Sequence, residues 1–223
     1  MRVERHMSDT NDFLRGLLPQ CHTNATLAEM SEYAADKFVP IIAPETEQFL
    51  RTLLTITQPA NILEIGTAIG YSALVFRSVC SAKIVTIEKD VDIANIAHNN
   101  FQKRYREAGD NSNGIRIIRG DAREVIAQMP SSAFEFIFVD AAKGQYIYML
   151  DDLIRLCAPR GIIVCDNVLY KGEVASGEYP AHKQRTIVTN LRRFLAEISD
   201  NPSLSTTILP LADGISVSVK IST

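Results

Sequence analysis

The stretch LEIGTAIGYS (residues 63–72) passes from an apolar, strand-like pattern through a turn with two glycines and into the start of a helix. Glycine permits a sharp backbone turn and lets a ligand lie against the main chain. Gly66 and Gly70 do not have the GxGxxG spacing of dinucleotide sites, because Ala68 stands where the second glycine would be. A dinucleotide pyrophosphate needs that close approach, whereas a cofactor without phosphates does not. We therefore expect Gly66 to lie in the binding site of a nucleoside cofactor that carries no phosphate.

Short apolar runs alternate with longer helical patterns along the chain around and after this turn. The runs are apolar on both sides, as parallel strands covered by helices must be. The expected strands are 61–65, 84–87, 115–118, 134–139 and 162–165. The expected helices between them are 72–79, 91–108, 122–129 and 145–157. This rhythm predicts an α/β, Rossmann-like fold with helices on both faces of a mostly parallel sheet.

The last part of the chain has a different pattern. After a helix over about 182–199, two strands at 205–209 and 215–220 are joined by a short connection. Such a connection permits only an antiparallel pair, because a parallel return needs a crossover of about a dozen residues or more. These two strands bring the expected sheet to seven. Two further helices, 27–38 and 45–56, precede the sheet and are separated by a segment with two prolines.

Length and composition favour one domain over residues 1–223. The chain is 46% hydrophobic and 22% charged, which is typical of a globular protein with a large core. Its net charge of -3 argues against a broad surface for coating nucleic acid, although it permits a local basic patch. No apolar stretch approaches the roughly 20 residues of a membrane span. The four cysteines have no metal-site spacing, so we expect reduced thiols in a cytoplasmic protein.

Acidic side chains follow the second and third strand patterns. Glu88 ends the second strand, where it is placed to accept hydrogen bonds from both hydroxyls of a ribose. Asp121 follows the third strand, where an adenine amino group would lie. Each carboxylate alone is as readily explained as a solvated strand end. In this order on successive strands, together with Gly66, they favour an adenosyl cofactor.

Two more strand patterns stop on oxygen-bearing side chains. Asp140 ends the fourth strand, and Asp166 and Asn167 end the fifth. Asp140 could simply cap the next helix, and Asp166 with Asn167 could form an ordinary turn. On neighbouring parallel strands, however, the three converge at one edge and offer hard oxygen ligands to a divalent cation such as Mg²⁺. Lys143 lies one helical turn beyond Asp140, and a lysine in that place can serve as a proton acceptor.

Six segments of the sequence, taken in order, resemble one family. They are ILEIGTAIGYSA (62–73), VTIEKD (85–90), RGDA (119–122), FVDAAKGQY (138–146), DNVLYKGEVA (166–175) and ILPLADGISVSVK (208–220). They look like the metal-dependent O-methyltransferases related to catechol and caffeoyl-CoA O-methyltransferases, whose Rossmann-like sheet also closes with an antiparallel hairpin. The resemblance is strongest to bacterial tRNA 5-hydroxyuridine methyltransferases. It runs from about residue 25 to the C-terminus, so residues 1–24 are a weakly matching extension.

The resemblance implies a cofactor, a metal and a set of site residues. The cofactor would be S-adenosylmethionine, and the metal Mg²⁺ or another divalent cation such as Mn²⁺ or Ca²⁺. The implied cofactor contacts are Ser72, Glu88, Asp121 and Asp140, with Ile42 bordering the methionine end. The implied metal ligands are Asp140, Asp166 and Asn167. Lys143 matches the catalytic lysine of the catechol enzymes, and the family is usually homodimeric.

Two classes of acceptor remain open, since both present two adjacent oxygens to the metal. One is 5-hydroxyuridine at the wobble position of a tRNA anticodon loop, and the other is a small catechol-like aromatic diol. A basic cluster and two tyrosines after the metal site favour RNA, since tyrosines can stack on unpaired bases. They are Lys171, Lys183, Arg185, Arg192 and Arg193, with Tyr170 and Tyr179. The alternative interpretation of the basic cluster is a solvated helix face.

Overall fold

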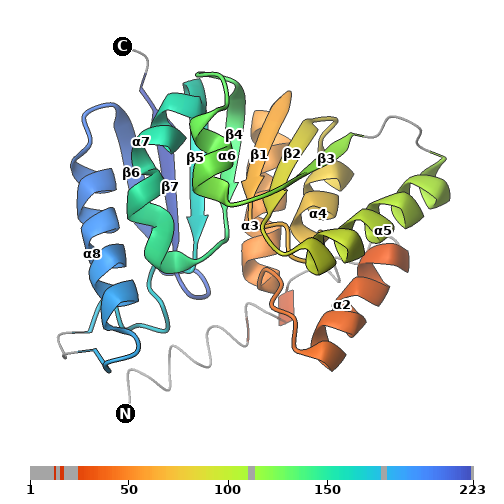
Figure 1. The fold of residues 1–223 in the computed structure, drawn as a ribbon, viewed down its shortest axis with the longest axis horizontal. Helices are drawn as coiled ribbons and strands as arrows, with labels where there is room; N and C mark the ends of the chain where they lie inside the picture. Colours follow the sequence, from red (N-terminus) through yellow and green to blue (C-terminus); the bar gives the residue numbers. More distant parts are fainter. Residues whose placement is uncertain (1–12, 14–15, 18–24, 110–113, 177–179, 222–223) are drawn as a thin grey trace.

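The computed structural model describes residues 13, 16, 17, 25–109, 114–176 and 180–221. In it a seven-stranded sheet has the order β3-β2-β1-β4-β5-β7-β6 (Figure 1). The strands are β1 (Asn61–Ile65), β2 (Lys83–Glu88), β3 (Ile115–Arg119), β4 (Phe134–Val139), β5 (Cys157–Asp166), β6 (Leu204–Leu209) and β7 (Ile215–Lys220). The first five are parallel, and β7 pairs antiparallel with both β5 and β6. The predicted Rossmann-like sheet with an antiparallel end is confirmed.

Helices cover both faces of the sheet, as the sequence predicts (Figure 1). One apolar core joins one face to α2 (Ala25–Lys37), α3 (Pro44–Thr57), α4 (Tyr71–Val79) and α5 (Val91–Ala108). A second core joins the other face to α6 (Ala122–Ala127), α7 (Tyr146–Leu156) and α8 (Arg185–Asp200). A short 3-10 helix, η1 (Lys143–Gln145), leads into α7. All the parallel strands therefore end at the same edge, between the two helical layers.

The fifth strand, β5, extends furthest beyond its predicted bounds. β5 begins at Cys157 rather than at residue 162, and its pairing with β4 shifts register between Phe134 and Phe136. The segment between contains Pro159 and Gly161, which are turn residues, and Arg160 has a positive φ of 64°. Local sequence therefore indicates a turn, whereas pairing with β4 draws the segment into a bulged strand. In contrast, α8 begins later than predicted, at Arg185 instead of residue 182.

The turn after β1 requires glycine because two strand ends lie against each other there. Gly66 has a φ of +101°, and a Cβ at this position would lie 2.1 Å from the carbonyl oxygen of Asp140. The backbone N–H of Asp140 donates to the carbonyl of Ile65 at 2.9 Å. Between β1 and β4 the strand order reverses, which is where doubly wound sheets bind ligands. The glycine therefore brings the predicted cofactor turn and Asp140 into contact.

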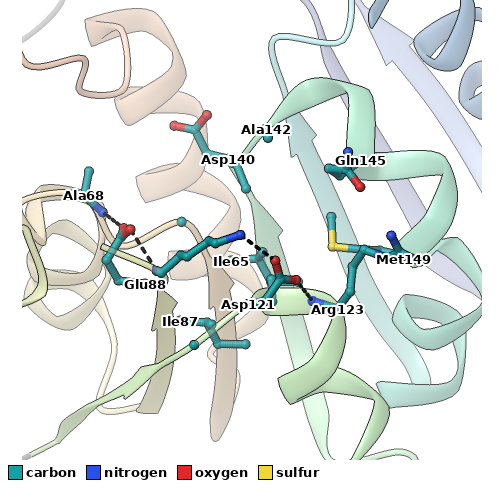
Figure 2. A pocket seen from close by; sticks show the side chains of 15 residues that line it. Ile65, Ala68, Ile87, Glu88, Asp121, Arg123, Asp140, Ala142, Gln145 and Met149 are labelled. Atoms are coloured by element: carbon teal, nitrogen blue, oxygen red, sulfur yellow. Dashed lines mark hydrogen bonds and ion pairs between the residues drawn. The ribbon is translucent and has the colours of Figure 1, made fainter. Parts of the chain in front are cut away.

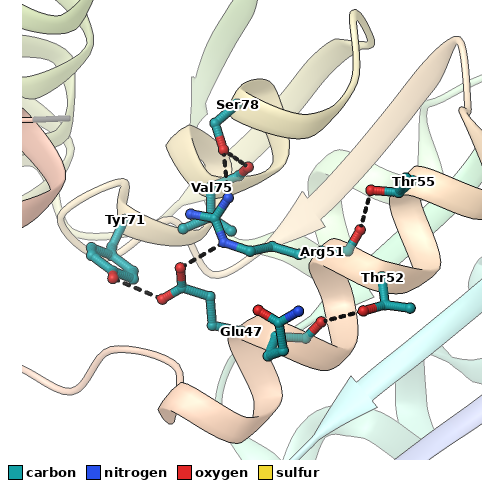
Figure 3. A network of polar contacts seen from close by, with 8 residues as sticks. Glu47, Arg51, Thr52, Thr55, Tyr71, Val75 and Ser78 are labelled. Carbon is teal, nitrogen blue, oxygen red and sulfur yellow. Dashed lines mark hydrogen bonds and ion pairs between the residues drawn. The ribbon is translucent and has the colours of Figure 1, made fainter. Parts of the chain in front are cut away.

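A buried polar network ties α3 to α4, the helix that follows that turn (Figure 3). The Glu47 carboxylate accepts hydrogen bonds from the Tyr71 hydroxyl and from Arg51 Nε, both at 2.8 Å. The Arg51 guanidinium also donates to Ser78 Oγ at 2.9 Å. A buried ion pair stabilises a fold only when its remaining hydrogen bonds are made, as they are here. Because Tyr71 is the first residue of α4, the network fixes the helix that follows the glycine turn.

Three predictions concern the whole chain. No helix in the described part of the chain has both the length and the apolar character needed to cross a membrane. Cys80, Cys157 and Cys165 are buried free thiols, as expected, and Cys21 lies outside the described residues. Most of the expected extension, residues 1–24, also lies outside them.

Candidate active site at the carboxyl edge of the sheet

A cavity of about 490 Å³ opens at the carboxyl ends of β1 to β4 (Figure 2). This volume falls within the range of small-molecule sites. Four of the predicted cofactor residues line it, namely Gly66, Glu88, Asp121 and Asp140. The other lining residues are Ile65, Ala68, Ile87, Lys89, Gly120, Ala122, Arg123, Ala141, Ala142, Gln145 and Met149. The structure thus assembles at one place carboxylates that the sequence distributes over three strands.

Glu88 is held against the glycine turn by main-chain donors. Its Oε2 accepts from the N–H of Ala68 at 3.0 Å, and its Oε1 accepts from the N–H groups of Lys89 and Asp90 at 2.9 and 3.0 Å. These bonds fix the carboxylate at the end of β2, at the wall of the cavity. A carboxylate offers about four lone-pair sites and these bonds occupy three of them, so room remains on Oε2 for a hydroxyl donor. This arrangement suits the predicted contact with ribose hydroxyls.

Asp121 lies at the rim of the cavity and begins α6. Its carboxylate accepts from the N–H of Arg123 at 3.1 Å and pairs with Lys89 Nζ at 3.0 Å. The Lys89 hydrogen bond, followed by the Arg123 N–H, holds the pKa of Asp121 below its ordinary value. Asp121 therefore stays ionised at neutral pH and can accept a hydrogen bond from an amino group.

Ser72 and Ile42, the other two residues predicted to contact the cofactor, do not line the cavity. Ser72 Oγ donates to Glu64 at 2.5 Å, and Thr86 Oγ1 donates to the same carboxylate at 2.6 Å. Ile42 is buried in the core beneath α2 to α5. Sequence reasoning missed Glu64, although a charge inside the apolar run of β1 was a visible signal. Glu64 lies fully buried between the glycine turn and β2.

We expect Glu64→Gln to change how stability depends on pH. Burial raises the pKa of Glu64 from 4.5 to about 7, so the folded protein keeps this proton between those pH values while the unfolded chain releases it. The free energy of unfolding should therefore fall by about 3 kcal/mol as pH rises from 4.5 to 7, and stay level above that. Urea denaturation of the ligand-free proteins from pH 5 to 8 should show that the free energy of unfolding falls with pH for the unaltered chain and falls less for the variant. Parallel pH profiles for the two proteins would contradict the assignment.

Asp140 and Asp166 lie side by side at the ends of β4 and β5. The last register pair of these strands is Val139 with Cys165, so the two aspartates follow at equivalent positions. Asp166 is buried, and its carboxylate accepts from the N–H of Asn167 at 2.7 Å. Burial, followed by the charge of Asp140, raises the pKa of Asp166 to about 6. The Lys143 ammonium donates to Asp140, although Asp140 lines the cavity and Lys143 lines a neighbouring hollow.

The donor set at this edge fits a divalent cation. Two carboxylates share a single neighbouring ammonium, so the pair keeps a net negative charge that a divalent cation would balance. Among the described residues, no group of three or more His, Cys, Asp and Glu side chains is placed to hold a metal. The predicted ligand set accordingly needs the amide oxygen of Asn167 beside Asp140 and Asp166. Carboxylate and amide oxygens are ligands that Mg²⁺, Mn²⁺ and Ca²⁺ accept.

The turn that carries Asn167 is held by the connection between β6 and β7. Asn167 has a φ of 55°, a left-handed conformation that asparagine tolerates well. The N–H groups of Val168 and Leu169 donate to the carbonyls of Gly214 and Asp213, each at 3.0 Å. The Asp213 carboxylate also accepts from the N–H of Lys171. The C-terminal hairpin therefore fixes the turn of Asn167, the third proposed metal ligand. The sequence indicated this residue but did not show its support by the hairpin.

A second hollow of about 490 Å³, the acceptor groove, adjoins the cavity between the starts of α7 and α8. It shares Ala141, Ala142 and Gln145 with the cavity. Its other lining residues are Lys143, Gly144, Tyr148, Tyr170, Thr186, Ile187 and Asn190. Lys143, the proposed catalytic lysine, therefore lines this groove together with two tyrosines, Tyr148 and Tyr170.

The predicted basic cluster divides into two groups. Arg192 donates to the carbonyls of Glu173, Val174 and Ser176, and Arg193 pairs with Glu197. These two arginines therefore stabilise the protein itself. Lys171, Lys183 and Arg185 are exposed, and Lys171 and Arg185 directly adjoin the groove residues Tyr170 and Thr186 in the sequence. Tyr170 lines the groove as expected, and Tyr179 lies outside the described residues.

Comparisons with known proteins agree with this architecture. The sequence matches the family model described as O-methyltransferase over residues 20–221. A catechol O-methyltransferase from Niastella koreensis is 30% identical over 188 residues, which cover 80% of this chain and 81% of the relative. A Staphylococcus aureus structure, provisionally assigned as a caffeoyl-CoA O-methyltransferase, has a TM-score of 0.83 at 30% identity and covers 95% of this chain and 99% of its own. An O-methyltransferase from Bacillus cereus, solved in complex with SAH, has a TM-score of 0.74 at 29% identity. The match covers 99% of this chain and 97% of the Bacillus cereus chain.

Proposed function

Because the chain belongs to the O-methyltransferase family, we propose that it transfers a methyl group from S-adenosylmethionine to an acceptor hydroxyl with the help of a divalent cation. One observation carries this proposal above all: a nucleoside-sized cavity and a pair of carboxylates with a lysine share Asp140 at one sheet edge. Cofactor and acceptor would meet at that residue. The Bacillus cereus relative, solved with SAH, supports the choice of cofactor.

The cavity provides contacts for each part of an adenosyl group. Glu88 would accept from the ribose hydroxyls, and Asp121 from the adenine amino group. The main chain at Gly66 permits close approach of the cofactor. Ser72 and Ile42 remain the proposed contacts of the methionine end. Neither residue lines the cavity, so the proposed cofactor site rests mainly on Gly66, Glu88 and Asp121.

The metal and the lysine have separate tasks in the proposed reaction. Asp140, Asp166 and Asn167 would hold Mg²⁺, Mn²⁺ or Ca²⁺, whose Lewis acidity favours ionisation of a nearby hydroxyl. Lys143, as the neutral amine, would take up the hydroxyl proton at Nζ, or its ammonium would stabilise the resulting oxyanion. The acceptor oxygen would then attack the methyl group, and S-adenosylhomocysteine would leave. Lys143 already pairs with Asp140, the residue at which cofactor and acceptor would meet. Most of the rate enhancement would come from positioning and charge stabilisation.

The acceptor that we propose is 5-hydroxyuridine at the wobble position of tRNA, which would become 5-methoxyuridine. Its 5-hydroxyl lies beside the 4-carbonyl and so offers two adjacent oxygens. The acceptor groove, with Tyr148 and Tyr170 in its wall, provides aromatic surface for a neighbouring base. Exposed Lys171, Lys183 and Arg185 would contact phosphates. A homodimer, which we also propose, would present two such basic surfaces to one anticodon loop.

A small catechol-like diol is the second candidate acceptor. The catechol O-methyltransferase of Niastella koreensis is 30% identical to this chain, which specifically favours this candidate. A catechol carries two adjacent oxygens in the same geometry, so the proposed metal ligands would serve it equally well. The basic surface around the groove would then have no role in the reaction.

The acceptor assay separates the two candidates. The protein would be incubated with Mg²⁺, methyl-labelled cofactor and either tRNA containing 5-hydroxyuridine or a catechol. We expect label in the tRNA, no label in a matched tRNA with uridine at the wobble position, and at most slow transfer to the catechol. Efficient transfer to the catechol with unlabelled tRNA would reject the RNA acceptor and favour the diol.

A further inference from the structure

The hydroxyl of Tyr146 bridges the two strands that carry the proposed metal ligands. Tyr146 is fully buried and is the first residue of α7. Its hydroxyl oxygen lies 3.1 Å from the carbonyl oxygen of Val139 and 3.1 Å from the carbonyl oxygen of Asp166. The hydroxyl has a single proton, so it is shared between these two acceptors. One of the acceptors directly precedes Asp140, and the other belongs to Asp166 itself.

The position of this bridge matters because the strand pairing reaches its end there. The register of β4 with β5 runs as far as Val139 and Cys165. Asp140 and Asp166 follow, and both carboxylates are negative groups that repel each other. A donor placed between the two main chains at this point holds the strand ends together against that repulsion.

The rest of the side chain keeps the hydroxyl in place. The Tyr146 ring packs edge-on against Phe194 of α8, with 5.6 Å between centroids. Lys143 Nζ lies 5.9 Å from the centre of the same ring. Burial, followed by the charge of Asp140, raises the pKa of Tyr146 well above its ordinary value. The phenol therefore remains a neutral donor at neutral pH.

We propose that Tyr146 is a positioning residue whose hydroxyl sets the separation of the Asp140 and Asp166 carboxylates and, through it, the affinity of the site for a divalent cation. The inference rests on the metal site of the proposed function. Tyr146 is among the lining residues of neither hollow, so it acts through the strand ends and does not contact the cofactor or the acceptor. Groups that orient metal ligands commonly change metal affinity about 10- to 100-fold when they are removed.

The test is Mn²⁺ binding to the metal-free full-length protein, followed by electron paramagnetic resonance without cofactor or acceptor. Tyr146→Phe removes only the hydroxyl and should weaken Mn²⁺ binding about 10-fold or more. SAH affinity, measured by calorimetry, should stay within twofold. Tyr105→Phe is the matched control, because its buried hydroxyl accepts from the N–H of Ile115 at 2.8 Å, at the start of β3. The Tyr105→Phe protein should lose about as much stability as the Tyr146→Phe protein, while its Mn²⁺ affinity stays unchanged.

The outcomes separate this inference from the metal site itself. If the unaltered protein binds no Mn²⁺, the metal site of the proposed function is wrong. If it binds Mn²⁺ and the Tyr146→Phe protein binds equally well, the positioning role is overturned. A second variant, with p-aminophenylalanine incorporated at position 146, places an amine that can donate to both carbonyls. It should bind Mn²⁺ nearly as the unaltered protein does, and a 10-fold loss there would also overturn the proposal, even where the Phe variant does not fold.

Discussion

Asp166→Asn is expected to abolish methyl transfer while leaving the metal-free protein at least as stable as the unaltered chain. The substitution keeps the volume of the side chain and an oxygen that can accept from the N–H of Asn167. It removes a buried charge that lies beside Asp140, and burial with this repulsion already raises the pKa of Asp166 to about 6. Without that charge, the site keeps one carboxylate of two and should lose its divalent cation. We expect transfer to fall by at least about 10³-fold, as for loss of a principal charge-stabilising group.

Methyl transfer should fall while the stability of the metal-free protein stays level or rises. A variant that was merely misfolded would lose both. Thermal unfolding at pH 8 without metal should show an equal or higher midpoint for the variant, and added Mg²⁺ should stabilise only the unaltered protein. Lys143→Met serves as the matched control at the same site. It removes a cation that pairs with Asp140, so metal binding should persist while transfer slows by about 10²- to 10⁴-fold. Full activity of Asp166→Asn would refute the metal assignment.

Gly66→Ala is expected to destabilise the fold by more than about 4 kcal/mol and to prevent cofactor binding in any protein that folds. An added Cβ would lie 2.1 Å from the carbonyl oxygen of Asp140, which is backbone and cannot move aside as a flexible side chain would. The two strand ends would have to separate, and the cavity lies between them. Because β1 and β4 are central in the sheet, the disruption should spread through both cores.

Gly109→Ala provides the control for this substitution. Gly109 also has a positive φ, of 61°, but no atom of the described residues lies within 4 Å of the position of its Cβ. Only the cost of the left-handed conformation applies there, about 1–2 kcal/mol. Urea denaturation should therefore rank the unaltered protein first, Gly109→Ala slightly lower and Gly66→Ala far lower. Similar losses for the two variants would show that conformation alone, without the clash, explains the requirement at Gly66.

The sequence predicted those site residues that end a strand. Glu88, Asp121, Asp140 and Asp166 each follow an apolar run, and parallel strands bring such ends to one edge without further information. Contacts between distant segments could not be predicted in this way. The pairing of Asp213 with the N–H of Lys171 depends on how the C-terminal hairpin packs, which no local pattern encodes.

Side-chain roles were harder to predict than positions. Arg192 looked like part of an RNA-binding surface, yet it donates to the carbonyls of Glu173, Val174 and Ser176. Tyr146 had no predicted role within the FVDAAKGQY segment, yet its hydroxyl joins two strand ends. In both cases the acceptors are main-chain carbonyls, which have the same chemistry at every position and leave no signal in the sequence.

The placement of β7 between β5 and β6 has a consequence for synthesis on the ribosome. β5 carries Asp166, and its outer edge pairs with β7, so that Ile162 lies opposite Val219 and Val164 opposite Val217. Translation produces β5 well before β7, and during that interval an apolar strand has an open edge. Such edges recruit strands from other chains, which is a recognised hazard for nascent and partly folded proteins. The last strand therefore follows the connection that holds the turn of Asn167, and it also closes an edge at which newly made chains are prone to aggregate.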